Sequence, residues 1–288
     1  PPILPDLPGV RKEFADYCTS VRRLDDMVGA VLDELASAKR VEDTIVIFLA
    51  DHGMPFPGAK FNCYPDSLRT PLIIRWPETV KDGAVDETHM VSTVDLQPTI
   101  LEAIGLSATE VSDGRSFLPI LRGEKQANRG VVFGQFYHIH GGDALPTYSV
   151  LTRQSAYVFN PWSDGKRRFP RLSGGAFNAM QQAAKKNAAM AARVKHLQYR
   201  SVEEFYNLNN DPSCLANILD NPKSNQKLNN LRGLLREWMV QVESPALNAF
   251  DKRKSKEALE RFVQSYRERA RKEVEALKPY EKANGYRF

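Results

Sequence analysis

The 288-residue chain is poor in cysteine and histidine and has no long apolar run. Its three cysteines, Cys18, Cys63 and Cys214, are widely separated and form no Cys-x-x-Cys pair. This excludes a disulfide-stapled scaffold or a zinc ribbon and leaves at most one bridge. No stretch is long and apolar enough to cross a bilayer, so we expect no membrane partner. No basic leader with an apolar segment precedes the first expected helix, but the chain opens with Pro rather than Met, so this says little about compartment.

The excess of positive charge is confined to the end of the chain. The formal net charge is +5, and residues 251–288 hold 12 Lys/Arg against 7 Asp/Glu, so this segment carries the whole excess. Charges of both signs are mixed in ERFVQSYRERARKEVEALK, which is typical of a solvated helix with opposite-charge pairs. A nucleic-acid-binding protein more often gathers basic residues on one face, with aromatic residues between them. We therefore expect a charged helical tail and no nucleic-acid partner.

The first 130 residues have the pattern of an α/β unit. Apolar residues recur every three or four positions from Val10 to Leu35, which predicts one long amphipathic helix. The run Thr44–Ala50 (TIVIFLA) is continuously apolar and β-branched, the form expected of a parallel strand buried on both faces. Pro71–Arg75 (PLIIR) repeats the strand signal, and VDLQPTILEAIG predicts a second helix that Gly105 ends.

Beyond Gly130 the pattern becomes that of a smaller antiparallel sheet. VVFGQFYHIH and YSVLTRQSAYVFN alternate aromatic or β-branched residues with polar ones, as strands do. The Ala-rich residues 176–194 favour a helix, EEFYNLNNDPSCLANI is rich in turn residues, and LNNLRGLLREWMVQV predicts another helix. The sequence thus predicts three parts: residues 1–130 within an α/β domain, 131–250 as a smaller subdomain and 251–288 as the tail.

A candidate site follows the strand TIVIFLA. Asp51 and His52 stand directly after it, and open α/β sheets carry functional residues beyond the carboxyl ends of their strands. A carboxylate and a neutral neighbour can share a divalent cation, while Gly53 and Gly58 let the backbone approach closely. Lys60 would supply a positive charge for an anionic substrate. The same residues also fit a plain loop, with Asp51 capping a helix, His52 satisfied and Lys60 solvated, and spacing alone leaves both interpretations open.

Four ordered segments resemble the sulfatase family. VEDTIVIFLADHGMPFPGAKFNCYPDSLRTPLIIRWP is similar to the family's strand ending in Asp-Asn-Gly or Asp-His-Gly, with Gly-Lys or Ala-Lys next and then an Arg-x-Pro-Leu-Ile strand. YCTSVRRLDDMVGAVLDEL, VSTVDLQPTILEAIGL and EEFYNLNNDPSCLANI resemble flanking segments in the same order, so the match runs from about Val10 to Trp238. DHGMPFPGAKFNCY and VFGQFYHIH look most like the sulfamidase branch, which hydrolyses N-sulfated glucosamine ends of heparan-type chains.

The resemblance implies a fold and three site residues. The family fold is alkaline-phosphatase-like, with a mixed sheet flanked by helices and a smaller C-terminal antiparallel sheet with helices, and this chain would be its C-terminal portion. Asp51 would be a ligand of a calcium ion, and His52 would occupy the adjacent ligand position, which is often Asn. Imidazole is a less usual partner for calcium than an amide oxygen. Lys60 would hold a sulfate or leaving-group oxygen and counter the charge that develops as the S–O or S–N bond breaks.

Substrate contacts are expected in VFGQFYHIHGG. A strand there places Phe136, His138 and His140 on one face and Gln135 and Tyr137 on the other. Histidines at such positions can simply lie on a solvated sheet face. In the resembling sulfamidases a histidine-bearing segment at this point faces the sugar, so we expect His138, and after it His140, to contact the glycan next to the sulfated group.

The resemblance also implies residues that this sequence lacks. The family's nucleophile is a Cys or Ser within C/S-x-P/A-S-R, oxidised to formylglycine, and two aspartates after an early strand complete the calcium site. CYPDSLR at Cys63 and CTSVR at Cys18 both fail that motif. Asp25 and Asp26 belong to the first helix, where we expect surface charges. We therefore expect formylglycine only in an N-terminal part outside these residues, and no activity from this chain alone.

Several interpretations stay open. The chain would be a fragment, one half of a split pair or an inactive truncation, and its expected partners are a sulfated saccharide and the missing N-terminal half. A metal-dependent phosphatase or phosphomutase of the same superfamily is the alternative enzyme, although five histidines supply a dinuclear site thinly. A non-catalytic remnant is the other alternative. The family suggests a periplasmic, secreted or lysosomal location, and an isolated chain should expose an apolar edge.

Overall fold

The computed structural model describes residues 2–107, 112–138, 144–170 and 172–284. They form two compact units that are interleaved along the chain. The sheet unit comprises residues 1–7, 53–69 and 133–288, and the α1 unit comprises residues 8–52 and 70–132. Among the helices in the described part of the chain, none is long and apolar enough to span a membrane.

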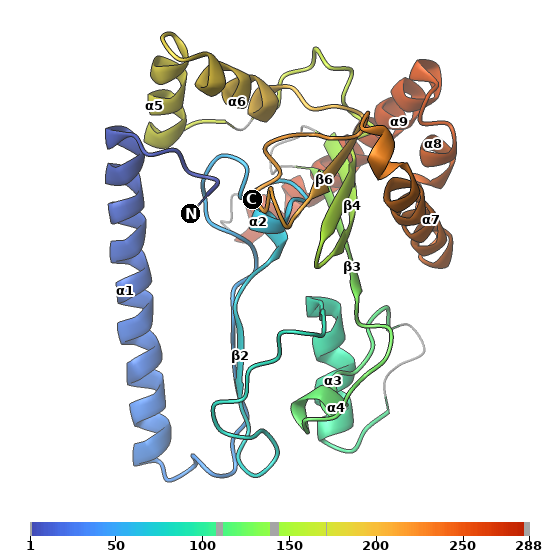
Figure 1. The fold of residues 1–288 in the computed structure, drawn as a ribbon. Helices are drawn as coiled ribbons and strands as arrows, with labels where there is room; N and C mark the ends of the chain where they lie inside the picture. The colour runs from blue at the N-terminus through green and yellow to red at the C-terminus, as the bar shows by residue number, and fades with distance from the viewer. Residues whose placement is uncertain (1, 108–111, 139–143, 171, 285–288) are drawn as a thin grey trace. The chain divides into compact units, whose positions relative to one another are not determined.

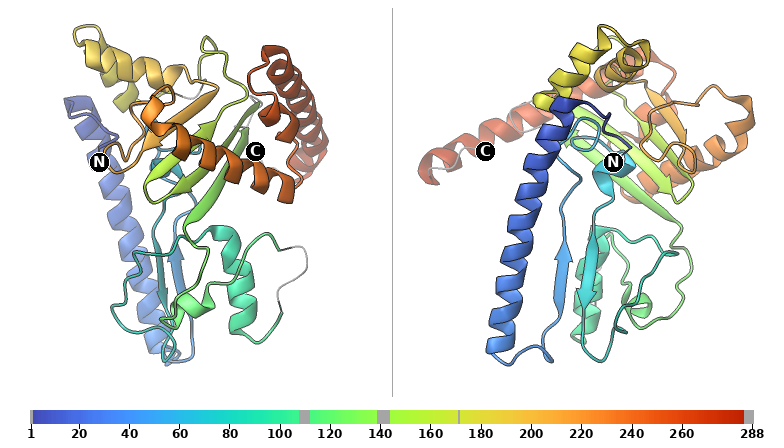
Figure 2. Two further views of the ribbon diagram at one scale, coloured as in Figure 1. Left: turned by 45° about the vertical axis from the view of Figure 1, so that its right-hand side comes forward. Right: turned by 60° about the vertical axis from the view of Figure 1, so that its left-hand side comes forward.

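The α1 unit combines one long helix with a two-stranded sheet and a few short helices. Helix α1 runs alongside the strands β1 and β2 (Figure 2). Its length agrees with the predicted helix, because apolar residues at every third or fourth position share one face. The exposed positions of Asp25 and Asp26 on α1 are confirmed. The elements of this unit are α1 (Pro8–Ser37), β1 (Val46–Leu49), β2 (Leu72–Arg75), η1 (Thr93–Asp95), α3 (Leu96–Ala103) and α4 (Leu118–Leu121).

The strand in TIVIFLA is present, but its predicted parallel, doubly buried setting is wrong. β1 pairs with β2 in an antiparallel sheet of two strands, with Val46 opposite Arg75 and Leu49 opposite Leu72. None of the four residues of β1 is buried, and Leu49 is 37% exposed. A parallel pair needs a long crossover connection, whereas residues 50–71 contain only one short helix between the two strands. An apolar run predicts a strand but not the direction of its partner.

Part of the apolar surface of the α1 unit is open to solvent. A groove of about 290 Å³ lies between α1 and the β1–β2 sheet, with Asp25 and Arg75 among its lining residues. Val31 on α1 is 67% exposed. An exposed apolar sheet edge was expected, and Ile73 on the edge strand β2, which is 63% exposed, agrees with it.

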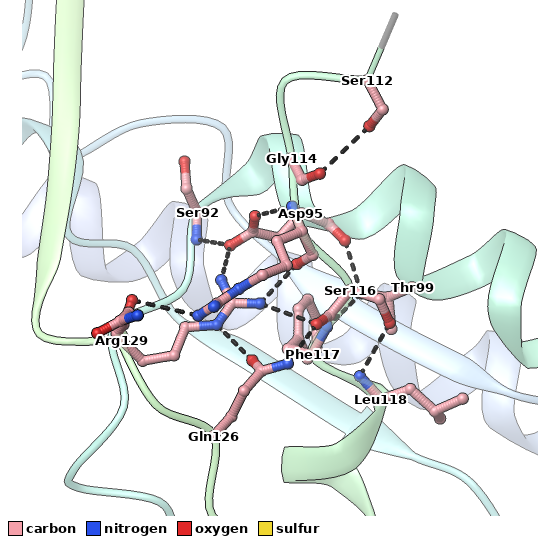
Figure 3. Close-up of polar contacts among 12 residues, drawn as sticks. Ser92, Asp95, Thr99, Ser112, Gly114, Ser116, Phe117, Leu118, Gln126 and Arg129 are labelled. Carbon is pink, nitrogen blue, oxygen red and sulfur yellow. Dashed lines mark hydrogen bonds and ion pairs between the residues drawn. The ribbon is translucent and has the colours of Figure 1, made fainter. Parts of the chain in front are cut away.

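A buried ion pair fixes the chain around the start of α3 (Figure 3). Asp95 is 6% exposed and Arg129 is 7% exposed, and Nη1 of Arg129 donates to Asp95 Oδ2 at 2.6 Å. The backbone N–H groups of Ser92 and Arg115 donate to the same carboxylate at 2.9 and 2.8 Å. Nη2 of Arg129 donates to the carbonyl oxygens of Arg115 and Ser116 at 2.6 and 2.9 Å. The pair therefore ties segments that are 34 positions apart to one another.

The sheet unit is built on four strands in the order β3-β4-β5-β6 (Figure 1). β4 and β5 pair antiparallel, as do β5 and β6, which confirms the predicted smaller antiparallel sheet. Every residue of β5 and all of β4 except Thr152 are buried. The elements are α2 (Pro65–Leu68), β3 (Val131–His138), β4 (Ala144–Thr152), β5 (Ser155–Phe159), α5 (Gly175–Ala184), α6 (Ala188–Gln198), β6 (Glu203–Asn207), η2 (Pro222–Ser224), α7 (Asn225–Gln241), α8 (Leu247–Asp251) and α9 (Lys256–Asn284).

The segment EEFYNLNNDPSCLANI is not all turn, because its first five residues form β6. Glu203 and Glu204 are both buried, which is unusual for acidic residues. The carboxylate of Glu203 accepts from Tyr157 Oη at 2.8 Å and from Arg232 Nε at 2.7 Å. Partners from other elements thus compensate the burial of acidic side chains in this strand. The strand was not predicted, because its local composition is rich in polar residues.

The charged tail forms α9, which is solvated on one side only. Lys256 pairs with Glu260 at 3.7 Å and Arg269 with Glu273 at 2.9 Å, so the expected opposite-charge pairs are confirmed. On the other side Val263 is buried in an apolar cluster with Leu145, Trp162 and Phe169. This tail is therefore part of the sheet unit's core as well as of its surface.

Candidate functional site

Asp51 and His52 lie together in the α1 unit, directly after β1. His52 Nε2 is 3.4 Å from Asp51 Oδ2, and the two side chains are 40% and 84% exposed. A carboxylate oxygen and an imidazole nitrogen this close can share one cation. Calcium takes six to eight ligands, however, and among the described residues no group of three or more His, Cys, Asp or Glu side chains could hold a metal ion. The pair fits two positions of a metal shell and leaves the others to further donors.

Residues 53–64 form the Lys60 loop, which belongs to the sheet unit and depends on two glycines. A Cβ atom on Gly53 would lie 1.9 Å from the carbonyl oxygen of Asp66. Gly58 has a φ of +84°, and a Cβ there would lie 2.9 Å from Ile3 Cδ1 and 3.1 Å from Leu197 Cδ2. The close backbone approach predicted for these glycines is confirmed at Gly53, whereas Gly58 is required by its positive φ.

Lys60 is followed by a residue in an unusual backbone conformation. Phe61 has a φ of +62°, which costs a bulky residue about 1–3 kcal/mol. The buried side chain of Asn62 donates from Nδ2 to the carbonyl oxygens of Gly58 and Lys60 at 3.1 and 2.9 Å, and its Oδ1 accepts from the N–H of Tyr64 at 2.8 Å. These three bonds hold the loop closed around Phe61.

The aromatic ring of Phe61 has two contacts of consequence. Lys60 Nζ lies over the ring, 5.0 Å from its centroid, within the range of a cation–π interaction. The ring also packs at 6.3 Å from that of Phe136 on β3 and against the apolar cluster that includes Trp162 and Val263. The lysine thus rests on a ring that the core of the sheet unit holds in place.

Cys63 is not available as a nucleophile. It is fully buried and donates from Sγ to the carbonyl oxygen of Thr147 at 3.5 Å. Burial raises the pKa of its thiol, so the thiolate does not form at neutral pH. Cys18 is exposed on α1, and all three cysteines are free. The failure of CYPDSLR to match a nucleophile motif is thus accompanied by a physical setting that disfavours reactivity.

A buried polar cluster, which no sequence pattern predicted, lies at the end of the Lys60 loop. Tyr64 Oη donates to Glu204 Oε2, and Arg200 Nη1 donates to Tyr64 Oη at 2.6 Å. Tyr206 Oη donates to the same oxygen of Glu204 at 3.0 Å. His196 packs beside these residues, its ring centroid 6.4 Å from that of Tyr64. The cluster joins residues from β6, the end of α6 and the Lys60 loop.

The stability of the sheet unit should fall as the medium becomes acidic. Burial, and then the charge of Arg200, lower the pKa of His196 against the opposing charge of Glu204. Below the ordinary histidine pKa of about 6.5, His196 is protonated in the unfolded chain but stays neutral in the folded chain. The free energy of unfolding therefore decreases as the pH falls below that value. Urea midpoints between about pH 8 and pH 5 should fall for the wild type and fall less for His196→Gln. Equal slopes in the two proteins would remove His196 as the cause.

The two histidines expected to contact a glycan are only partly described. His138 is the last residue of β3, and its side chain is not described. His140 lies outside the described residues. The predicted alternation is visible just before them, because Tyr137 Oη donates to Gln135 Oε1 at 2.6 Å, which places both side chains on one face. Contact of either histidine with a sugar stays a prediction.

Comparison with known proteins places the chain in a family. The family model "Sulfatase" matches residues 6–106, and the model "N-sulphoglucosamine sulphohydrolase, C-terminal" matches residues 58–159. Asp51 and His52 lie in the first matched range, and Lys60 lies in both. The chain belongs to the sulfatase family, as its motifs predicted.

Individual relatives refine this assignment. Human N-sulphoglucosamine sulphohydrolase is 33% identical over 267 residues, which cover 87% of this chain and 52% of that protein. An ulvan-active sulfatase of Formosa agariphila is 27% identical over 250 residues, covering 85% of this chain and 41% of that protein. The chain spans about half the length, or less, of these two relatives. The predicted similarity to the sulfamidase branch is confirmed.

The fold is shared with solved sulfatase structures. One, described as a complex with its substrate D-glucosamine-2-N,6-O-disulfate, superposes with a TM-score of 0.57 at 21% identity over 79% of this chain and 40% of that one. Another, a 2-O GAG sulfatase, has a TM-score of 0.56 at 22% identity over 77% and 41%. At these identities the likeness concerns the fold, and it confirms the predicted alkaline-phosphatase-like class.

Proposed function

We propose that this chain is the C-terminal portion of a calcium-dependent sulfatase that hydrolyses a sulfamate or sulfate ester of a saccharide such as N-sulfoglucosamine. The observation that carries the proposal is the exposed acid–imidazole pair of Asp51 and His52 directly after β1, with Lys60 eight positions further along the chain. These residues lie within the sulfatase match, and Lys60 also within the N-sulphoglucosamine sulphohydrolase match. The formylglycine nucleophile would come from a segment outside these 288 residues.

Each proposed role follows from the chemistry of the side chain. Asp51 and His52 would hold the calcium ion, which supplies positive charge for the sulfate group. Lys60 would bind a sulfate or leaving-group oxygen as negative charge develops there. His138, and after it His140, would donate hydrogen bonds to glycan oxygens next to the sulfated group. The names of two relatives, a sulphoglucosamine sulphohydrolase and an ulvan-active sulfatase, support a sulfated saccharide as the substrate.

Replacing Asp51 by alanine should weaken calcium binding. In an active sulfatase that contains this chain, calorimetry should show calcium affinity lower by more than about tenfold, because the ion loses a charged oxygen ligand. Asp82→Ala, which removes another exposed acid of the α1 unit, is the matched control and should leave affinity unchanged. The 288-residue chain by itself should bind calcium weakly. Unchanged affinity in the Asp51 variant would remove this residue from the metal site.

The choice of substrate separates the proposal from its alternatives. The same active protein should hydrolyse N-sulfoglucosamine and aryl sulfate faster than the corresponding phosphate ester. Faster phosphate hydrolysis would instead favour a phosphatase of the same superfamily. Absence of turnover on all three compounds, with formylglycine verified by mass spectrometry, would favour a non-catalytic remnant.

A further inference from the structure

The Lys60 loop contains two residues, Phe61 and Asn62, that both contact the lysine. Phe61 adopts a positive φ of 62° although it is neither Gly nor Asn, the residues that tolerate this conformation best. A strained conformation persists only where the surroundings enforce it, and such residues gather at functional sites. Its position directly after Lys60 links the strain to the proposed sulfate-binding group.

Asn62 supplies the bonds that enforce this conformation. The residue is 8% exposed, and within the described part of the chain its side chain makes hydrogen bonds to Gly58, Lys60 and Tyr64, all in the loop. One of these bonds is to the carbonyl oxygen of Lys60 itself, at 2.9 Å. The side chain therefore fixes the backbone on both sides of Phe61, and with it the direction in which the lysine leaves the loop.

Phe61 supplies the surface on which the lysine rests. Lys60 Nζ lies 5.0 Å from the centroid of the Phe61 ring, and the ring is packed against Phe136 and the apolar cluster beyond it. With φ negative, the usual conformation, the ring of residue 61 would leave the backbone in another direction and lose this position under the ammonium group. An ordered ammonium group needs no reorganisation when it binds an anion.

We propose that Asn62 and Phe61 are positioning residues for Lys60, which hold its ammonium group ready for a sulfate oxygen. Asn62 closes the loop, the closed loop holds Phe61 at positive φ, and the Phe61 ring orders the lysine side chain. Sulfate as the bound anion rests on the proposed sulfatase function, whereas the ordering of the Lys60 side chain does not depend on that function.

The ordering can be measured by NMR on the 288-residue chain with lysine labelled. The ring beneath Lys60 should shift the signals of its ε protons upfield. Asn62→Ala should bring these signals to the values of a solvated lysine, and it should raise the apparent Kd for inorganic sulfate by about three- to tenfold, since one long side chain must then be immobilised on binding. Asn62→Asp, which keeps the acceptor for the Tyr64 N–H and loses both donors, gives a second test if the alanine variant does not fold.

A matched control distinguishes positioning from general stability. Asn160 is another buried asparagine of the sheet unit; its Nδ2 donates to the Ser201 carbonyl at 3.0 Å and its Oδ1 accepts from Thr147 Oγ1 at 3.2 Å. Asn160→Ala should lower the melting temperature as Asn62→Ala does, but leave the Lys60 signals and the sulfate Kd unchanged.

Two outcomes would overturn the proposal. One is an unshifted Lys60 signal in the wild type, or a shift that survives in both Asn62 variants. The other is an equal loss in Asn160→Ala, which would show that any destabilisation of the unit disorders the lysine. If the wild-type chain shows the shifted signal but does not bind sulfate, sulfate is wrong as the ligand. The ordering of Lys60 by Asn62 and Phe61 would still be supported by the NMR result.

Discussion

Replacing Lys60 by alanine should abolish most of the catalytic activity of a sulfatase that contains this chain while leaving its fold intact. Turnover of a sulfate ester should fall by about 10²–10³-fold, the effect of removing one preorganised charge from a developing anion. The side chain contributes little to packing, because Lys60 is not fully buried and is not part of the apolar cluster against which Phe61 packs. Steady-state rates on N-sulfoglucosamine and on an aryl sulfate measure the effect.

Lys60→Arg is the matched variant for this prediction. It keeps the positive charge and changes only its geometry, so its loss of turnover should be smaller. Thermal unfolding of both variants should be close to that of the wild type. If Lys60→Ala instead melts the sheet unit at markedly lower temperature with turnover per folded molecule unchanged, the lysine has a structural role and the sulfate-binding role is wrong.

Replacing Asp95 by alanine should destabilise the α1 unit by about 3–5 kcal/mol, the cost of leaving a buried charge without its partner. Arg129 would lose its 2.6 Å bond to the carboxylate, and two backbone N–H groups would lose their acceptor. Hydrogen exchange of the amides in α3 measures the effect, since it reads the α1 unit separately from the sheet unit.

An exposed ion pair in the same unit provides the control for this second prediction. Arg40 Nη2 lies 3.1 Å from Asp43 Oδ2, with side chains 64% and 53% exposed. Asp43→Ala should therefore cost less than about 1 kcal/mol. A loss of similar size in Asp95→Ala and Asp43→Ala would mean that burial of the Asp95–Arg129 pair has little bearing on stability.

The sequence predicted most elements of the fold because their signals are local. Apolar spacing of three and four residues predicted α1, and alternation of aromatic and polar residues predicted the strands of the small sheet. Strand direction was beyond reach, because whether β1 runs parallel or antiparallel depends on a partner more than twenty positions away. β6 was hidden for a related reason: Glu203 looks like a turn or surface residue until Arg232 and Tyr157 are brought to it.

The candidate site was predictable where it depended on position and residue type. Asp51 and His52 could be found because they follow a strand, and Lys60 because it lies in a Gly-rich loop after them. Asn62 and Phe61 were missed, because a positive φ is expected of glycine and a phenylalanine gives no hint of it. The Tyr64–Glu204 bond joins residues 140 positions apart, and only the folded chain brings them together.

The interleaving of the two units limits how the protein can be divided. Residues 53–69 contribute Tyr64 to the sheet unit, yet they lie between two stretches of the α1 unit along the chain. A fragment beginning near residue 133 would keep Arg200 and Glu204 but lose the phenol that bonds to both. Two buried charged groups would then lack a common partner, and the same cut would remove the Lys60 loop. For expression of domains, for protease mapping and for gene fusions alike, a break at the apparent boundary would therefore divide the site and the core at once.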